Sequence, residues 1–123
     1  MKTSSKINIA KLISRLLVFF LKKKNICTKR NGLNWSLDLN EAIDLSIYLT
    51  GRFEPSIFYI IKTLSKNKKY DYIDIGANNG AHSLYLAQKF SKSKIYAIEP
   101  TDYSFYKLLR NIELNPGIKN QII

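Results

Sequence analysis

An α/β fold with a short parallel sheet is predicted, and three observations support it. Two β-rich runs, residues 70–75 and 95–98, are each followed by a turn and then by a run of helical periodicity. A glycine-rich turn, residues 76–80, comes directly after the first run. Residues 120–123 then begin what is predicted to be a third strand. The order β-α-β-α-β is the first half of a doubly wound sheet built with right-handed crossovers.

The composition is that of an ordinary globular chain. The 123 residues are 46% apolar and 24% charged, which excludes disordered, collagen-like and low-complexity proteins. A single cysteine, Cys27, excludes an internal disulfide. With one histidine, His82, the chain also has no Cys/His cluster for zinc, so no metal is predicted. The length predicts one domain or less, divided into segments 1–30, 31–69 and 70–123.

The net charge of +11 is concentrated near the amino terminus. Residues 1–30 contain nine Lys and Arg and no acidic residue, whereas residues 31–123 contain eleven basic and nine acidic residues. The basicity therefore belongs to an arm rather than to the body of the chain. Because no recognition motif accompanies this charge, we predict no nucleic-acid partner.

An amphipathic helix is predicted over residues 7–21 of the basic arm. Its longest unbroken apolar run has six residues, where a membrane span needs about 20. A signal peptide is excluded by the bases within and directly after this run and by the lack of a cleavage site. One face carries Ile9, Leu12, Ile13, Leu16, Leu17 and Phe20.

Two interpretations of this helix remain open. It could cap the domain, or it could lie on an anionic membrane surface with Lys22, Lys23 and Lys24 at the headgroups. The absence of export signals and paired cysteines predicts a cytoplasmic protein, peripheral to the membrane under the second interpretation.

A hairpin and two helices are predicted between the arm and the sheet. Asn31 and Gly32 both tolerate the positive φ of a type I′ turn, and apolar residues alternate with polar ones through residues 33–39. Asn40 is predicted to cap the first helix, which ends at Gly51. Pro55 suits the first turn of the second helix. Residues 65–69 are a predicted solvated linker.

The last predicted helix has apolar residues at positions i, i+3, i+4 and i+7 from Phe105. Thr101 or Asp102 is its predicted cap. Asn111 and Asn115 are assigned to capping and turn formation.

A nucleoside site is predicted where the first strand meets the glycine-rich turn. Gly76 and Gly80 let the backbone turn tightly and approach a ligand without a Cβ in the way. The helix that follows directs free N–H groups at the loop, which can receive an anion or a carboxylate. Glu99, at the end of the adjacent strand, is placed to accept hydrogen bonds from both hydroxyls of a ribose. The alternative is a strand-to-helix turn without a ligand.

The spacing of the loop distinguishes between classes of nucleoside. The dinucleotide fingerprint has glycines at i, i+2 and i+5, but here these positions are Gly76, Asn78 and Ala81. A nicotinamide-binding module is therefore kept only as an alternative. The pattern Asp-x-Gly-x-Asn-x-Gly instead resembles the first motif of S-adenosylmethionine (SAM) dependent methyltransferases, in which the acid helps order the loop and the methionine end of the cofactor.

Three stretches resemble the FkbM-type SAM-dependent methyltransferase family: D-I-G-A-N-N-G-A-H-S-L-Y-L-A, Y-A-I-E-P and Y-K-L-L-R-N-I-E-L-N. Upstream, L-D-L-N and L-T-G-R-F-E-P are also similar, so the resemblance runs from about Trp35 to the last residue. It implies a Rossmann-like methyltransferase fold, SAM as cofactor, and O-methylation of a sugar or another small molecule.

The resemblance also assigns site residues. The residues that it places around the cofactor are Asp74, Gly76, Ala77, Asn78, Gly80, Glu99 and Glu54. Within this set Glu99 binds the ribose, and Glu54 lies near the methionine moiety. His82 is predicted to be a helix-face residue rather than a base, and no catalytic base is identified.

The family continues beyond the resemblance with further strands, among them a segment of the type Asp-x-Glu-Gly that shapes the acceptor side. No such segment occurs here, which predicts a truncated or split form that needs a complementary carboxyl-terminal fragment. Tyr72, Ile73 and Ile75 would then lie on an unpaired apolar edge. The alternative function is a non-catalytic membrane-surface protein that keeps a vestigial nucleotide-binding fold.

Overall fold

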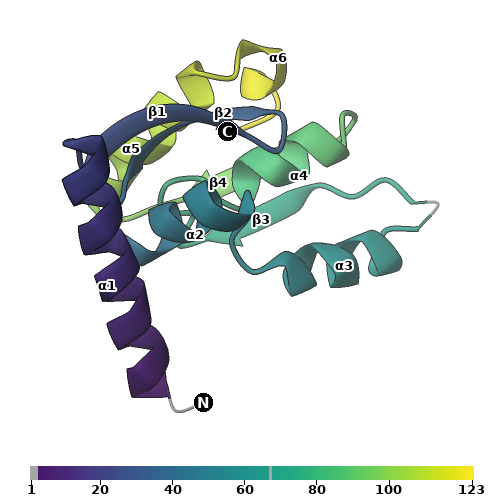
Figure 1. The fold of residues 1–123 in the computed structure, drawn as a ribbon. Coiled ribbons are helices and arrows are strands. Elements are labelled where there is room, and N and C mark those ends of the chain that lie inside the picture. The colour runs from purple at the N-terminus through teal and green to yellow at the C-terminus, as the bar shows by residue number, and fades with distance from the viewer. Residues whose placement is uncertain (1–2, 67) are drawn as a thin grey trace.

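The computed structural model describes residues 3–66 and 68–123, which form a mixed α/β chain (Figure 1). Met1 and Lys2 of the predicted arm, and Asn67 of the predicted linker, lie outside the described residues. The elements are α1 (Thr3–Leu21), β1 (Asn25–Arg30), β2 (Leu33–Asp38), α2 (Ala42–Thr50), α3 (Pro55–Leu64), β3 (Tyr72–Ile75), α4 (Ser83–Lys89), β4 (Ile95–Ile98), α5 (Asp102–Glu113) and α6 (Pro116–Lys119).

Strands β1 and β2 form an antiparallel hairpin around the predicted turn. Arg30 pairs with Leu33, and the two turn residues have the positive φ expected of a type I′ turn, 51° at Asn31 and 82° at Gly32. Alternate side chains of β2 are buried, as the sequence pattern predicts. Because β1 comes from residues 1–30 and β2 from residues 31–69, the hairpin joins these two segments.

Strands β3 and β4 pair in parallel, with Tyr72 opposite Ile95 and Ile75 opposite Ile98. The predicted third strand is represented by a single parallel bridge between Ile122 and Ile95 on the other side of β4. The described residues therefore form the order β3, β4 and the carboxyl end of the chain, with β3 at an edge.

The helices before the sheet begin and end at the predicted residues, with one correction at the cap of α2. Helix α2 ends at Gly51, which has a φ of 80°, and α3 begins at Pro55. Asn40 was predicted to cap α2, but the cap position is occupied by Glu41. The Asn40 side chain instead accepts a hydrogen bond from the Ser14 hydroxyl of α1, at 3.2 Å.

Two asparagines on the carboxyl side of α5 bind the backbone of β2. The N–H groups of Ser36 and Asn34 donate to the side-chain oxygens of Asn111 and Asn115, each at 2.8 Å. Asn115 also donates to the Asn34 carbonyl at 2.7 Å. The capping role is wrong for Asn111, which lies within α5, whereas Asn115 does occupy the cap position of α6, in the turn that follows α5. Both carboxamides replace a neighbouring strand along the edge of β2 that β1 leaves open.

The core lies between the hairpin, α4, α5 and the parallel sheet. It contains side chains from β2, α2, α3, α4, β4 and α5, among them Trp35, Ile47, Phe58, Leu84, Ile95 and Leu108. Among the described residues this core includes no side chain of α1. Figure 1 shows α1 extending away from the rest of the chain, with the amino terminus at its far end.

One face of the parallel sheet is open to solvent. Ile73 and Ile75 of β3 are 67% and 80% exposed, and Tyr96 and Ile98 lie beside them in the register of β4 and are exposed too. We call these four residues the open sheet face. All three residues of the predicted apolar edge lie on the edge strand β3. The two isoleucines are exposed there, whereas the Tyr72 ring is half-buried against Phe90, with the ring centroids 5.1 Å apart.

A candidate cofactor site

The glycine-rich loop turns sharply at the carboxyl end of β3. The N–H groups of Gly76 and Ala77 donate to the Ile98 carbonyl of β4, at 2.8 and 3.0 Å. Gly76, Asn78 and Gly80 have positive φ values of 77°, 50° and 87°. The loop is therefore fastened to the neighbouring strand while it reverses direction toward α4.

The two glycines of the loop face different surroundings. A Cβ added to Gly76 would meet no atom within 4 Å, so open space lies against the backbone there. A Cβ added to Gly80 would collide with the Leu84 side chain and lie 2.8 Å from Leu108 Cδ1. Gly80 is thus required by core packing, whereas Gly76 leaves room for a ligand.

Glu99 comes directly after β4, and its carboxylate is bound to the loop. The Asn78 N–H donates to Oε2 at 2.9 Å, and the N–H and hydroxyl of Thr101 donate to Oε1 at 2.9 and 2.6 Å. A carboxylate has about four acceptor positions, so about one remains for a further donor. The two ribose hydroxyls of the prediction could both bind only if the Thr101 hydroxyl released Oε1.

These bonds also affect the ionisation of Glu99. The Thr101 hydroxyl, followed by the Thr101 and Asn78 N–H groups, lowers the pKa of the Glu99 carboxyl from 4.5. A carboxyl group whose pKa is lower in the folded state than in the unfolded state stabilises the fold at pH values above its unfolded-state pKa. That contribution is lost as the pH falls through the folded-state value. Near neutral pH Glu99 is therefore an ionised hydrogen-bond acceptor.

Replacing Thr101 with Ala is expected to raise the pKa of Glu99, because the hydroxyl makes the largest contribution to lowering it. The carboxyl carbon of Glu99 can be followed by NMR through an acid titration. Thr101→Ser is the matched control, since it keeps the hydroxyl and should keep the low pKa. An identical midpoint in the Ala variant and the unmodified chain would contradict this account.

Asp74, on β3, ties the strand to the helix beyond the loop. The buried Ser83 hydroxyl, in the first turn of α4, donates to Asp74 Oδ2 at 2.6 Å. This bond fixes the two ends of the loop relative to one another.

The N–H groups of the loop are already bound within the protein. Each N–H from residue 76 to residue 81 has a protein acceptor. The N–H groups predicted to receive an anion are those at the start of the helix, α4, which begins at Ser83, so the bonds of the loop do not test that prediction. The acceptors are the Ile98 carbonyl for Gly76 and Ala77, Glu99 for Asn78, Asn78 Oδ1 for Asn79, the Ala77 carbonyl for Gly80 and Asn79 Oδ1 for Ala81. Side chains and open space, rather than these amides, are left to bind a ligand.

Asp44 of α2 binds the loop through the Asn79 side chain. It was not among the predicted site residues. Its fully buried carboxylate accepts hydrogen bonds from the Asn79 side chain, from Lys107 Nζ at 2.6 Å and from the Asp38 N–H at 2.6 Å. Asn79 is fully buried too, and its carbonyl accepts from Asn111 at 2.9 Å. A carboxylate from α2 and an ammonium from α5 thus meet beneath the loop.

The sequence contained one signal for the burial of Asp44. Asp44 precedes Ile47 and Tyr48 by three and four residues, which places it on the apolar side of its helix. Its cationic partner, Lys107, is 63 residues away and has no such signal.

Glu54 lies beside His82 at the amino end of α4. Glu54 Oε2 is 3.5 Å from His82 Nε2, and Glu54 has a left-handed φ of 46° at the position before α3. The His82 ring packs against Phe53 and Phe58, with centroids 5.7 and 5.4 Å away. Within residues 3–66 and 68–123, its buried Nδ1 has no hydrogen-bond partner. The structure thus brings Glu54 to the helix end that follows the loop.

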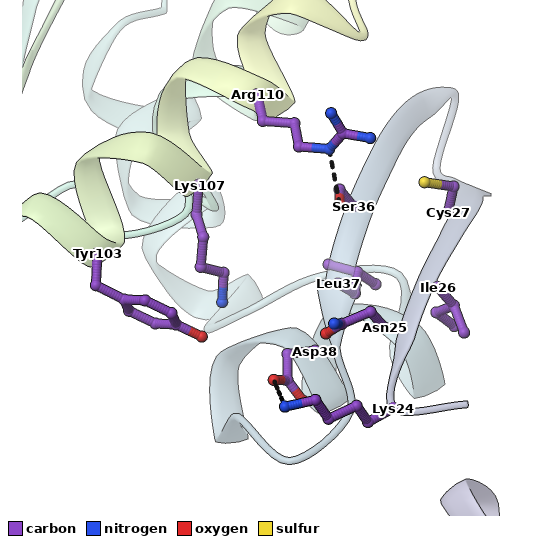
Figure 2. A pocket seen from close by; sticks show the side chains of 10 residues that line it. All are labelled: Lys24, Asn25, Ile26, Cys27, Ser36, Leu37, Asp38, Tyr103, Lys107 and Arg110. Atoms are coloured by element: carbon purple, nitrogen blue, oxygen red, sulfur yellow. Dashed lines mark hydrogen bonds and ion pairs between the residues drawn. The ribbon is translucent and has the colours of Figure 1, made fainter. Parts of the chain in front are cut away.

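A hollow of about 470 Å³ lies between the hairpin and α5 (Figure 2). Lys107 and Arg110 project into it from α5, and Lys24 lines its other side. The partners of these three cations are Asp44, the Ser36 hydroxyl at 3.3 Å and Asp38 at 4.0 Å. Because each cation already has an oxygen partner, we assign no anion to this hollow.

Sequence comparison finds distant methyltransferase relatives. No family model matches the chain. The chain is 33% identical over 90 residues to methyltransferase sdnD of Sordaria araneosa, covering 66% of this chain and 34% of that protein. It is 31% identical over 81 residues to Methyltransferase 1 of Beauveria bassiana, covering 58% of this chain and 32% of that protein. The chain therefore spans about a third of the length of the curated relatives it matches.

Two solved structures share the fold. PH0793 from Pyrococcus horikoshii matches 96% of this chain with a TM-score of 0.54 and 23% identity. TYW2 of P. horikoshii, in complex with MeSAdo, matches 99% with a TM-score of 0.55 and 21% identity. In each case the match covers 48% of the solved chain. The described chain is thus similar in fold to about half of each of these two solved chains.

Proposed function

We propose that this chain is the cofactor-binding part of a SAM-dependent methyltransferase of the FkbM type, acting on a hydroxyl of a sugar or another small molecule. The main support for the proposal is that Gly76 and Glu99 lie at the same end of the parallel sheet. Open space faces Gly76, and the ionised Glu99 carboxylate is fastened to the same loop through Asn78. The methyltransferase relatives and the MeSAdo complex of TYW2 support the choice of SAM as the nucleoside.

The residues around the loop suit the parts of SAM. Glu99 would accept a hydrogen bond from a ribose hydroxyl, and the space at Gly76 would admit the nucleoside against the backbone. Asp74 and Asn78 hold the loop in shape, and the half-exposed Glu54 carboxylate is a suitable partner for the α-ammonium of the methionine moiety. When bound, SAM supplies a methyl group on a sulfonium. The chain's part is to orient that group, since alignment with the acceptor oxygen provides much of the rate.

The open sheet face is the proposed contact for the rest of the fold. About half of each matched solved structure lies beyond the part this chain covers. In the described chain β3 pairs on one side only, and the open sheet face presents four apolar side chains next to that edge. We propose that the remaining strands and helices, in the same or a separate polypeptide, cover this face and build the acceptor side.

Calorimetric titration of the purified chain with SAM tests this function. Saturable binding is expected, and Glu99→Gln should weaken it by about 10- to 100-fold, because a hydrogen bond to a charged acceptor is lost. Glu113→Gln is the matched control, since it makes the same change on an exposed side chain at the end of α5. Failure of a folded chain to bind SAM, or equal affinity in both variants, would overturn the proposal. So would tighter binding of a reduced nicotinamide dinucleotide than of SAM.

A further inference from the structure

Helix α1 has an apolar face that the rest of the chain does not cover. Its body-facing side is marked by the buried Ser14, which binds Asn40, and by Ile13, which lies against α2. The adjoining side carries large exposed apolar residues at helical spacing, which we call the outer face: Leu12, Leu16, Phe19 and Phe20. Ile9 lies at its border, in the hollow that α1 shares with α2. The two phenylalanines are each 75% exposed. A continuous apolar face of this kind marks a contact surface.

The charges around the outer face indicate which kind of surface it contacts. Lys11 and Arg15 lie four residues apart beside it, and both are exposed. Three further exposed cations, Lys22, Lys23 and Lys24, come immediately after the helix. No acidic residue occurs in residues 1–30. An apolar stripe whose charged neighbours within residues 1–30 are all cations complements an anionic bilayer, where the stripe enters the acyl boundary and the cations meet the headgroups.

The helix is suited to lie on a membrane surface. Within the described residues, no helix has both the length and the apolar character to cross a bilayer. Helix α1 extends away from the body (Figure 1). Because the side chains of its outer face are exposed, this face can meet a flat surface. We propose that α1 docks the protein on anionic membrane surfaces through its outer face. This inference does not depend on the cofactor site, and its failure would leave the proposed methyltransferase function intact.

Co-sedimentation of the full chain with vesicles tests the proposal. Vesicles of phosphatidylcholine with about 30% phosphatidylglycerol should bind the chain, and pure phosphatidylcholine vesicles should bind it far more weakly. The triple variant Lys22→Gln, Lys23→Gln, Lys24→Gln should lose on the order of 100-fold in affinity, since each surface cation adds to the attraction. Added salt should weaken binding in the same way.

A second pair of variants tests the outer face itself. Leu16→Glu with Phe20→Glu places charge on the stripe and should abolish vesicle binding. Tyr59→Glu with Ile60→Glu is the matched control, because it makes the same change on exposed apolar residues of α3 and should bind as the unmodified chain does. Equal vesicle binding by both pairs would overturn the proposal. It would also be overturned if the chain formed a dimer that only the α1 pair disrupts and showed no vesicle binding, because the outer face would then contact a second copy.

Discussion

Replacing Lys107 with Met is expected to lower the free energy of unfolding by about 3–5 kcal/mol. Lys107 Nζ lies 2.6 Å from Asp44 Oδ2, and the Asp44 side chain is fully buried. Without the ammonium group, a buried carboxylate is left with no opposite charge, and breaking such a pair costs more than the pair contributes. Urea denaturation of the unmodified and variant chains measures the loss.

Two further variants define the cause of this loss. In Asp44→Asn with Lys107→Met the buried charge is also removed, so the double variant should be no less stable than Lys107→Met alone. Lys62→Met, at an exposed position of α3, is the matched control and should change stability by less than about 0.5 kcal/mol. Equal losses from Lys62→Met and Lys107→Met would contradict a structural role for the buried pair.

Alanine at Gly76 is expected to lower SAM affinity on the order of 100-fold, because the new methyl group enters the space assigned to the nucleoside. The backbone at Gly76 has a φ of 77°, so the substitution should also cost about 1–2 kcal/mol of stability. Calorimetry with SAM and urea denaturation measure the two effects separately.

The neighbouring glycine provides the contrast. Gly80→Ala adds a collision with Leu84 to a similar backbone cost, and overpacking adds about 1–3 kcal/mol, so its main effect should be on stability. Gly117→Ala, in α6, meets no atom within 4 Å, so it should leave SAM affinity unchanged and should not lower stability. A Gly76→Ala variant that binds SAM as tightly as the unmodified chain would place the nucleoside elsewhere.

Features that depend on adjacent residues were predictable from the sequence. The hairpin turn at Asn31 and Gly32, the end of α2 at Gly51 and the start of α3 at Pro55 each depend on backbone preferences of those residues. The proximity of Glu99 to the glycine loop was also predictable, because the carboxyl ends of parallel strands meet at the same edge of a sheet.

Features that depend on distant residues were not predictable. Asn111 and Asn115 bind β2 backbone groups 75 and 81 residues earlier, and local rules assign such residues to caps and turns. Asp44 meets Lys107 across 63 residues. The acceptors of the loop N–H groups also depend on the tertiary turn, which brings the side chains of the loop and the Ile98 carbonyl of β4 to these groups.

The position of bound SAM directly tests the proposed cofactor site. Amide NMR spectra of the labelled chain, recorded during a SAM titration, report which residues surround the cofactor. We expect saturable shifts at Gly76 and Asn78, with Ser36 and Arg110 at the hollow beside α5 unchanged. Shifts confined to Ser36 and Arg110, with Gly76 and Asn78 unchanged, would contradict the proposed site.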